Sequence, residues 1–193
     1  MQKKMWMYLL VMVLGLGFCV MNAEAAGVNA PKPRVCAVLI GAPDLKTEDF
    51  INAMQDSFNG SENNTRVASG TEIQSKYQEY WLNKGELEEG KLTPAVMFDF
   101  TKYSGYDKCL FVVAKETIEK SKRPASLWMM VEVTRASVEL KCFLADDKNV
   151  LKIINVIKND DSVHSDLRAK RGAFEKGIRE TAKQLNDFLT LKH

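Results

Sequence analysis

The chain has 193 residues, of which 46% are hydrophobic and 27% charged, and its 27 basic and 25 acidic side chains give a net charge of +2. This near balance excludes a global electrostatic attraction to nucleic acid or to an anionic membrane. The length is enough for one domain with a sizeable core.

The first 25 residues have the layout of a secretory signal peptide. Lys3 and Lys4 precede an uncharged apolar run, residues 5–21, and Ala23 and Ala25 supply the small-x-small pattern that signal peptidase reads. The run is shorter than the roughly 20 residues that span a bilayer comfortably, and no basic stop-transfer cluster follows it. Cleavage after Ala25 is therefore favoured over an uncleaved anchor.

Cys19 is not expected to carry a lipid. The bulky Phe18 directly before it does not fit the small residue of a lipobox, so Cys19 is expected to leave with the signal peptide. The compact signal is typical of a bacterium. The sequence therefore predicts a protein that is released into the periplasm or secreted, with no membrane span after cleavage.

Residues 26–193 retain three cysteines, and an odd number excludes a fully paired disulfide framework. Cys36, Cys109 and Cys142 all lie in apolar, strand-like runs. Three inert thiols in the core are the favoured interpretation, and one bridge between Cys36 and Cys109 is the alternative. No histidine or basic residue is placed to activate a thiolate.

The first half of the chain predicts alternating strands and helices. After a linker at 26–33, the apolar run 34–41 predicts a strand that is covered on both faces. Thr47 is a candidate N-cap for a helix that ends at Asn59 and Gly60. A short strand is predicted at 65–68, and a second helix follows and ends at Gly85.

The second half predicts a different arrangement. Thr93 and Pro94 begin a third helix that extends through Tyr103, and residues 108–114 form another apolar strand. Residues 127–144 alternate between apolar and polar side chains, as in a strand with one face in solvent. A turn at 146–149 returns the chain into a strand at 150–157. A closing helix runs from about Asp166 to Leu191.

These elements predict a single α/β domain over residues 34–191, in the order β-α-β-α-α-β-β-β-α. The apolar strands form the parallel part of a mixed sheet, and the two later strands add an antiparallel hairpin at its C-terminal side.

Groups suited to catalysis are sparse. His164 lies in a polar linker and His193 is the last residue, and neither belongs to a recognisable nucleophile or metal motif. The acidic pairs at 146–147 and 160–161 lack the spacing of a calcium loop, and solvated turns are the favoured interpretation. We therefore expect no catalytic residue, no cofactor and no metal, with a hydrolase kept only as a remote alternative.

Two surface features are candidates for binding a partner. Arg168, Lys170 and Arg171 crowd the first turns of the closing helix, where the helix dipole disfavours positive charge. Either nearby carboxylates, such as Asp160, Asp161 and Asp166, or an anionic ligand could compensate them. Tyr80 and Trp81, with Tyr77, span more than one side of their helix, so one ring is expected to be exposed.

Several short motifs resemble envelope domains related to the TolB N-terminal domain, a group that includes the curli secretion channel subunit and lipoprotein activators of cell-wall synthases. The step through Gly105 and Asp107 into the strand at 109–113 is similar to their helix-Gly-x-Asp-x-strand step. The hairpin around Asp146 and the closing helix are also similar. The chain departs from several of these proteins because it lacks a lipobox and any membrane-inserting hairpin insertion.

The resemblance implies a non-enzymatic periplasmic or surface module that binds another envelope protein or a cell-wall component. The alternative is a protein that binds a small ligand or anion in the crevice beyond Gly41, at the carboxyl ends of the apolar strands.

Overall fold

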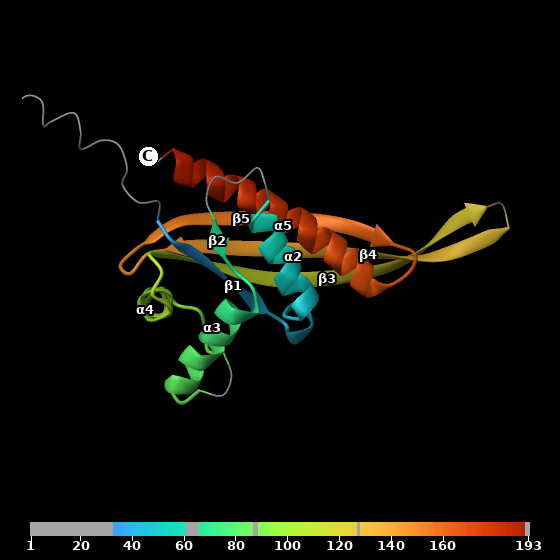
Figure 1. Cartoon of the computed structure of the whole chain (residues 1–193). Coiled ribbons are helices and arrows are strands. Elements are labelled where there is room, and N and C mark those ends of the chain that lie inside the picture. The colour runs from blue at the N-terminus through green and yellow to red at the C-terminus, as the bar shows by residue number, and fades with distance from the viewer. Residues whose placement is uncertain (1–32, 61–65, 87–88, 127, 192–193) are drawn as a thin grey trace, which may run out of the picture. The chain divides into compact units, whose positions relative to one another are not determined.

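The computed structural model describes residues 33–60, 66–86, 89–126 and 128–191, so the predicted signal peptide and nearly all of the linker lie outside the described residues. The described residues belong to one compact unit (Figure 1). Its elements are β1 (Val35–Gly41), η2 (Pro43–Leu45), α2 (Glu48–Phe58), β2 (Val67–Ala68), α3 (Thr71–Asn83), α4 (Pro94–Ser104), β3 (Lys108–Ser126), β4 (Met129–Ala145), β5 (Val150–Ser162) and α5 (Asp166–Thr190).

The strands form one mixed sheet in the order β2-β1-β3-β4-β5. β1 pairs in parallel with both β2 and β3, whereas β3, β4 and β5 pair antiparallel. This confirms the predicted class, element order and division into a parallel part and a C-terminal antiparallel part.

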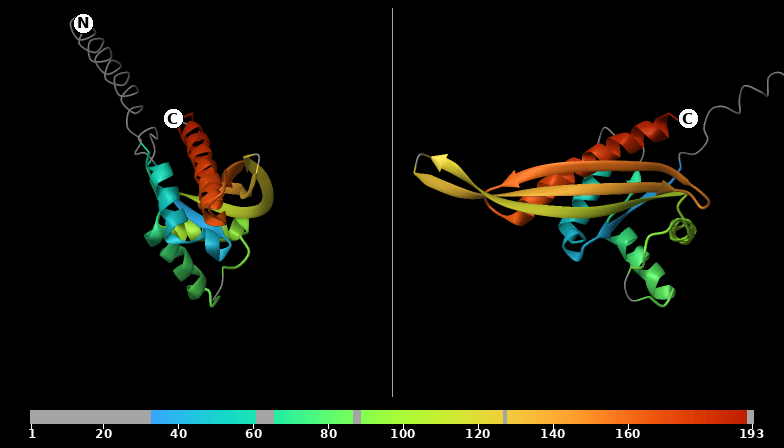
Figure 2. Two further views of the ribbon diagram at one scale, coloured as in Figure 1. Left: turned by 90° about the vertical axis from the view of Figure 1, so that its right-hand side faces the viewer. Right: turned by 180° about the vertical axis from the view of Figure 1, so that it is seen from behind.

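Helices cover both faces of the sheet (Figures 1 and 2). α2 and α5 pack on one face, where Phe50 and Phe174 meet edge to face with ring centroids 5.1 Å apart. α3 and α4 pack on the other face, around Tyr77, Phe100 and Phe111. β1 and the first half of β3 lie between the two layers, and this explains why their sequences are apolar without alternation.

Local sequence sets the ends of α4 and α5. Thr93 Oγ1 accepts a hydrogen bond from the N–H of Val96, and Gly105 ends α4 with a φ of 76°. Ser165 Oγ caps α5 in the same way, by accepting from the N–H of Arg168. Thr47 holds the N-cap position of α2, although its side chain makes no capping bond.

The antiparallel strands are longer than predicted. β3 continues for twelve residues beyond Ala114, and the acidic pair 160–161, expected in a turn, lies inside β5. Both extensions are polar, so hydrophobic periodicity does not reveal them. The backbone ladder holds them together, since β3 pairs with β4 from Cys109 almost to the hairpin end.

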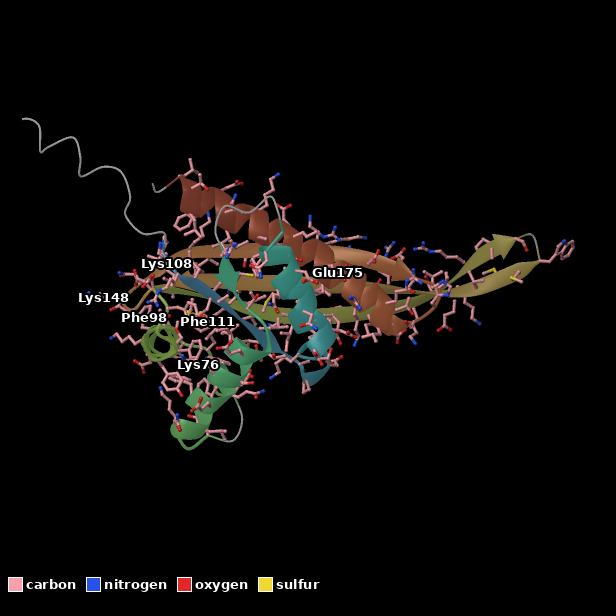
Figure 3. All side chains as sticks on the ribbon, in the orientation of Figure 1. Lys76, Phe98, Lys108, Phe111, Lys148 and Glu175 are labelled. Atoms are coloured by element: carbon pink, nitrogen blue, oxygen red, sulfur yellow. A yellow bond between two sulfur atoms is a disulfide. The ribbon has the colours of Figure 1, made fainter. Side chains whose placement is uncertain are left out.

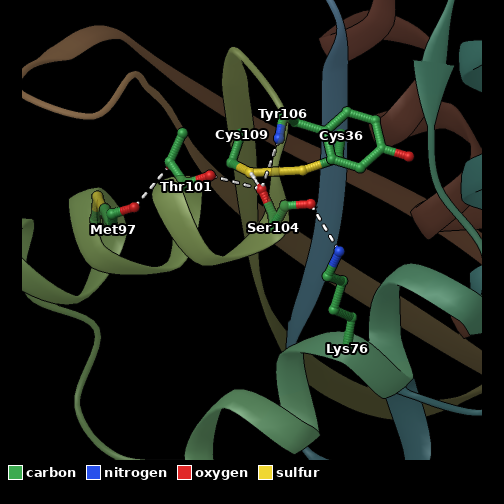
Figure 4. Close-up of a disulfide and its surroundings, with 7 residues drawn as sticks. All are labelled: Cys36, Lys76, Met97, Thr101, Ser104, Tyr106 and Cys109. Atoms are coloured by element: carbon green, nitrogen blue, oxygen red, sulfur yellow. Dashed lines mark hydrogen bonds between the residues drawn. A yellow bond between two sulfur atoms is a disulfide. The ribbon is translucent and has the colours of Figure 1, made fainter.

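The prediction of three free thiols is wrong, because Cys36 and Cys109 form a disulfide (Figure 4). These residues are directly opposite each other in the parallel pairing of β1 and β3, with Cα atoms 4.8 Å apart. Ser104 Oγ lies 3.4 Å from Cys109 Sγ and accepts from the N–H of Tyr106. Cys142 is a free, buried thiol, as expected, and burial raises its pKa to about 12.

A side chain from α3 completes the hydrogen bonding of β1. β2 pairs with β1 only at Val35 and Cys36, so the edge of β1 beyond them has no neighbouring strand. Gln74 takes the place of that strand at Leu39. Its Oε1 accepts from the Leu39 N–H at 3.1 Å, and its Nε2 donates to the Leu39 carbonyl at 2.9 Å.

Candidate functional site: a projecting hairpin

The two aromatic side chains predicted to bind a partner are buried. Tyr80 and Trp81 are each 4% exposed, and Tyr77 is fully buried. The expectation that one of these three rings is exposed is wrong, because α4 and the sheet cover the sides of α3 from which the rings project. Tyr80 contacts the rings of Phe100 and Tyr103, and Tyr103 is the member of this cluster that reaches the surface.

The three basic residues singled out at the start of α5 do not form one patch. Lys170 is directed toward the sheet, with a side chain only 13% exposed. Arg171 pairs with Glu175 one turn further along the helix, at 2.9 Å. Arg168 lies beside the start of α5, facing the β3–β4 hairpin.

Carboxylates of the same chain pair with Lys170 and Arg171, but they are not the ones proposed from the sequence. Asp160 pairs with Lys176, Asp161 with Arg135 and Arg123, and Asp166 with Lys120. The long antiparallel strands bring these partners together, and linear distance along the chain did not indicate them.

An ion-pair triad lies beyond Gly41, where the crevice was expected. Lys170 Nζ lies 2.6 Å from Asp44 Oδ2 and 2.7 Å from Glu116 Oε1. The hydrogen bond from Lys170 lowers the pKa of Asp44 below its ordinary value of 3.8. Two carboxylates against one ammonium give this edge a net negative charge, which opposes the binding of an anion there.

Replacing Lys170 by methionine is expected to lower the free energy of unfolding at pH 7 by about 1–3 kcal/mol, because Glu116 loses its partner in a half-buried position. The folded-state pKa of Asp44 is depressed, so its contribution is present above pH 3.8 and is lost as the pH falls through the folded value. The difference in the free energy of unfolding between wild type and variant should therefore become smaller below about pH 4. Urea unfolding across this pH range measures it.

Arg171→Met is the matched control for this experiment. Glu175, the partner of Arg171, is more exposed than Glu116, so the loss in the free energy of unfolding should stay below about 1 kcal/mol. An equal loss in both variants would contradict a structural role for the triad.

The most exposed large apolar side chain among the described residues, Trp128, lies at the end of the β3–β4 hairpin. β5 ends at Ser162, which pairs with Thr134 of β4, and Thr134 in turn pairs with Lys120 of β3. Beyond this point β3 and β4 continue as a two-stranded ribbon, which we call the arm (residues 121–126 and 128–133). Six residues of strand correspond to about 20 Å. Figures 1 and 2 show the arm extending past the start of α5.

Three consecutive apolar side chains lie at the end of the arm. Trp128 is 97% exposed, Met129 58% and Met130 60%. We call these three residues the tip. Figure 3 shows the end of the arm extending beyond the body of the domain, although Val133 at the base of the arm is buried. An exposed apolar cluster of this kind indicates a candidate interaction site.

Ion pairs hold the base of the arm on the domain. Asp161 of β5 accepts from Arg135 of β4 at 2.8 Å and also pairs with Arg123 of the arm at 3.2 Å. Lys120 pairs with Asp166 at 3.1 Å, and Thr134 donates to the same carboxylate at 2.7 Å. These contacts direct the arm away from the domain.

A shallow pocket of about 370 Å³ lies beside the base of the arm, between Arg123, Arg168 and His164. Asp161 also lines it, and hydrogen bonding from Arg135 lowers the pKa of Asp161, which remains a carboxylate at neutral pH. This negative charge neutralises part of the arginine charge, so the pocket offers no strong anion site.

Among the described residues, no group of three or more His, Cys, Asp or Glu side chains is placed to hold a metal ion. His164 is exposed, and His193 lies outside the described residues. In the same ranges, no helix is both long and apolar enough to cross a membrane.

Sequence reasoning missed the arm, although one feature indicated its tip. Residues 128–131 read Trp-Met-Met-Val and interrupt the alternation expected of a strand with one face in solvent. Such a run is either buried on both faces or exposed for a purpose. Among the described residues, this part of β4 pairs with β3 alone, and Trp128, Met129 and Met130 are exposed.

No family model and no curated protein matches this chain. Among solved structures, hypothetical protein CT253 from Chlamydia trachomatis is similar over 81% of this chain and 98% of its own, with 11% identity and a TM-score of 0.46. Lipoprotein GNA1162 from Neisseria meningitidis is similar over 80% of this chain and 99% of its own, with 15% identity and a TM-score of 0.42.

A minor lipoprotein from Acinetobacter baumannii is similar over 84% of this chain and 95% of its own, with 9% identity and a TM-score of 0.32. At these values the likeness is a general one to small bacterial proteins, some of them lipoproteins, and it identifies no molecular role.

Proposed function

We propose that the chain is an exported bacterial protein of the cell envelope that acts by binding, through its arm, and not by catalysis. The observation that carries this proposal is the tip, where Trp128, Met129 and Met130 are exposed at the end of a ribbon that the domain does not cover. The ion pairs of Asp161 and Asp166 position this ribbon, as expected for a presented surface.

Two further features support export. The signal-like segment at 1–25 has the order of charge, apolar core and small residues that secretion requires. The disulfide between Cys36 and Cys109 is of a kind that forms and persists in oxidising compartments.

Kinship with the TolB N-terminal group is the finer part of this proposal. The residues that suggested it have defined local roles: Gly105 ends α4, and Asp107 accepts from the backbone N–H of Arg34 at 2.7 Å and so ties the start of β3 to β1. Asp146 closes the β4–β5 turn by accepting from the N–H groups of Lys148 and Asn149. By this resemblance, the expected partner is another envelope protein or a cell-wall component.

Expression of the full chain in a bacterium, followed by fractionation, tests the proposal. We expect a processed protein that begins at residue 26, lies in the envelope or periplasmic fraction, and has one thiol, Cys142, that reacts with maleimide only after unfolding. A full-length chain in the cytoplasm with four reduced thiols, Cys19 included, would contradict the proposal.

A further inference from the structure

The tip differs from other exposed apolar residues of the domain in being continuous. Ile153, Ile157 and Leu167 are also more than half exposed, but they are separated from one another along β5 and α5. Scattered residues of this kind are normal on a protein surface. Trp128, Met129 and Met130 are instead consecutive in the sequence, and they lie at the closed end of the β3–β4 hairpin.

The tip is apolar on more than one side. Successive side chains of a strand point to opposite faces, so Met129 and Met130 project from the two faces of the ribbon, and Trp128 occupies the turn before them. A groove on a protein would cover one of these faces and leave the other exposed to water. The apolar boundary of a bilayer would surround the whole tip.

The charges next to the tip are mostly basic. Residues 120–133 contain three basic side chains and one acidic one, Glu132, which lies opposite Lys122 in the ladder and 3.9 Å from Lys120. Lys120 and Arg123 are held by Asp166 and Asp161 at the base of the arm, whereas Lys122 has no ion pair within the described residues. A tryptophan with lysine and arginine beside it is the composition of an interfacial anchor, in which the ring lies at headgroup level and the bases face anionic lipid.

From these observations we propose that the tip inserts into the headgroup region of an anionic phospholipid bilayer, without spanning it, and so docks the domain on a membrane surface. This inference rests on the proposed envelope function, which supplies the membrane. Interfacial binding scales with the apolar area buried plus the attraction of basic residues to anionic lipid, and the tip supplies both.

The test measures binding of the exported, processed protein to vesicles, because uncleaved residues 1–25 would themselves bind lipid. The vesicles contain phosphatidylcholine alone, or equal parts of phosphatidylcholine and phosphatidylglycerol. The processed chain has two tryptophans, and Trp81 is 4% exposed, so a lipid-dependent blue shift and quenching by brominated lipid report on Trp128.

We expect binding to the anionic vesicles, with quenching strongest for bromine placed near the headgroups. Trp128→Ser should weaken the partitioning about tenfold or more. Lys122→Gln should weaken it about fivefold on anionic vesicles and leave binding to neutral vesicles unchanged. Ile157→Ser and Lys183→Gln, which make the same changes on the body of the domain, should bind as wild type does.

Absence of a blue shift with both vesicle types would overturn the inference, and so would equal binding by Trp128→Ser and wild type. A tip that ignored vesicles but crosslinked to a protein would also overturn it. These failures are distinct from failure of the proposed function. A processed, oxidised envelope protein whose tip ignores lipid would refute the membrane docking alone.

Discussion

Loss of the disulfide between Cys36 and Cys109 is expected to lower the free energy of unfolding by about 4 kcal/mol. The bridge closes a loop with a sequence separation of 73 residues, and its main effect is to restrict the unfolded chain. For a domain of this size the loss corresponds to a fall in melting temperature of about 10 °C. Thermal unfolding of the Cys36→Ala/Cys109→Ala double variant, with and without reductant, measures it.

The free thiol provides the control for this prediction. Cys142 is buried and unbridged, so Cys142→Ala should retain the full sensitivity to reductant, whereas the double variant should have none. An unfolding midpoint of the double variant equal to that of the oxidised wild type would contradict a stabilising bridge.

Gln74→Met is expected to cost about 2–4 kcal/mol, because each of two buried backbone groups of Leu39 loses its hydrogen-bond partner. Methionine preserves the length of the side chain, so little of the loss would come from a cavity. The Leu39 amide should also exchange its hydrogen much faster in the variant. Urea unfolding together with native-state hydrogen exchange measures both effects.

Gln184→Met makes the same substitution on the outer side of α5. The Gln184 amide donates to Glu180, a surface carboxylate, and the change should cost no more than about 0.5 kcal/mol. If Gln74→Met were as mild as this control, Gln74 would not substitute for a missing strand at the edge of β1.

The sequence was sufficient to predict the class, order and layering of the elements, because the burial of one or both faces of an element determines the pattern of apolar side chains along it. β1 and the start of β3 are continuously apolar because helices cover both of their faces. The side chains along β4 alternate between apolar and polar because α5 covers one face of this strand. The helix ends at Thr93, Gly105 and Ser165 follow local rules of the backbone and need no tertiary information.

What the sequence did not reveal depends on pairing across the chain. The far half of β3 is a strand because β4 pairs with it, not because its own residues favour burial. Gln74 looks like a surface residue until the early end of β2 leaves the edge of β1 open. The disulfide required the register of β1 against β3, which places Cys36 opposite Cys109.

The expected exposure of an aromatic ring and the expected partners of Lys170 were wrong for a related reason. Tyr80 and Trp81 were expected to leave a ring at the surface because they span more than one side of α3, but α3 is covered on two sides, by the sheet and by α4. Lys170 was expected near acidic residues of its own region, and its partners Asp44 and Glu116 come from η2 and β3. Neither arrangement can be derived from helical periodicity alone.

Photocrosslinking in intact cells tests the central claim, that the tip of the arm is the binding surface of an envelope protein. A photoreactive amino acid is placed at position 128 in one variant and, as control, at position 157, an exposed apolar site on the outer face of β5. Adducts with envelope lipid or an envelope component are expected from position 128, and far fewer from position 157. Equal labelling at the two positions, or none at 128, would contradict it.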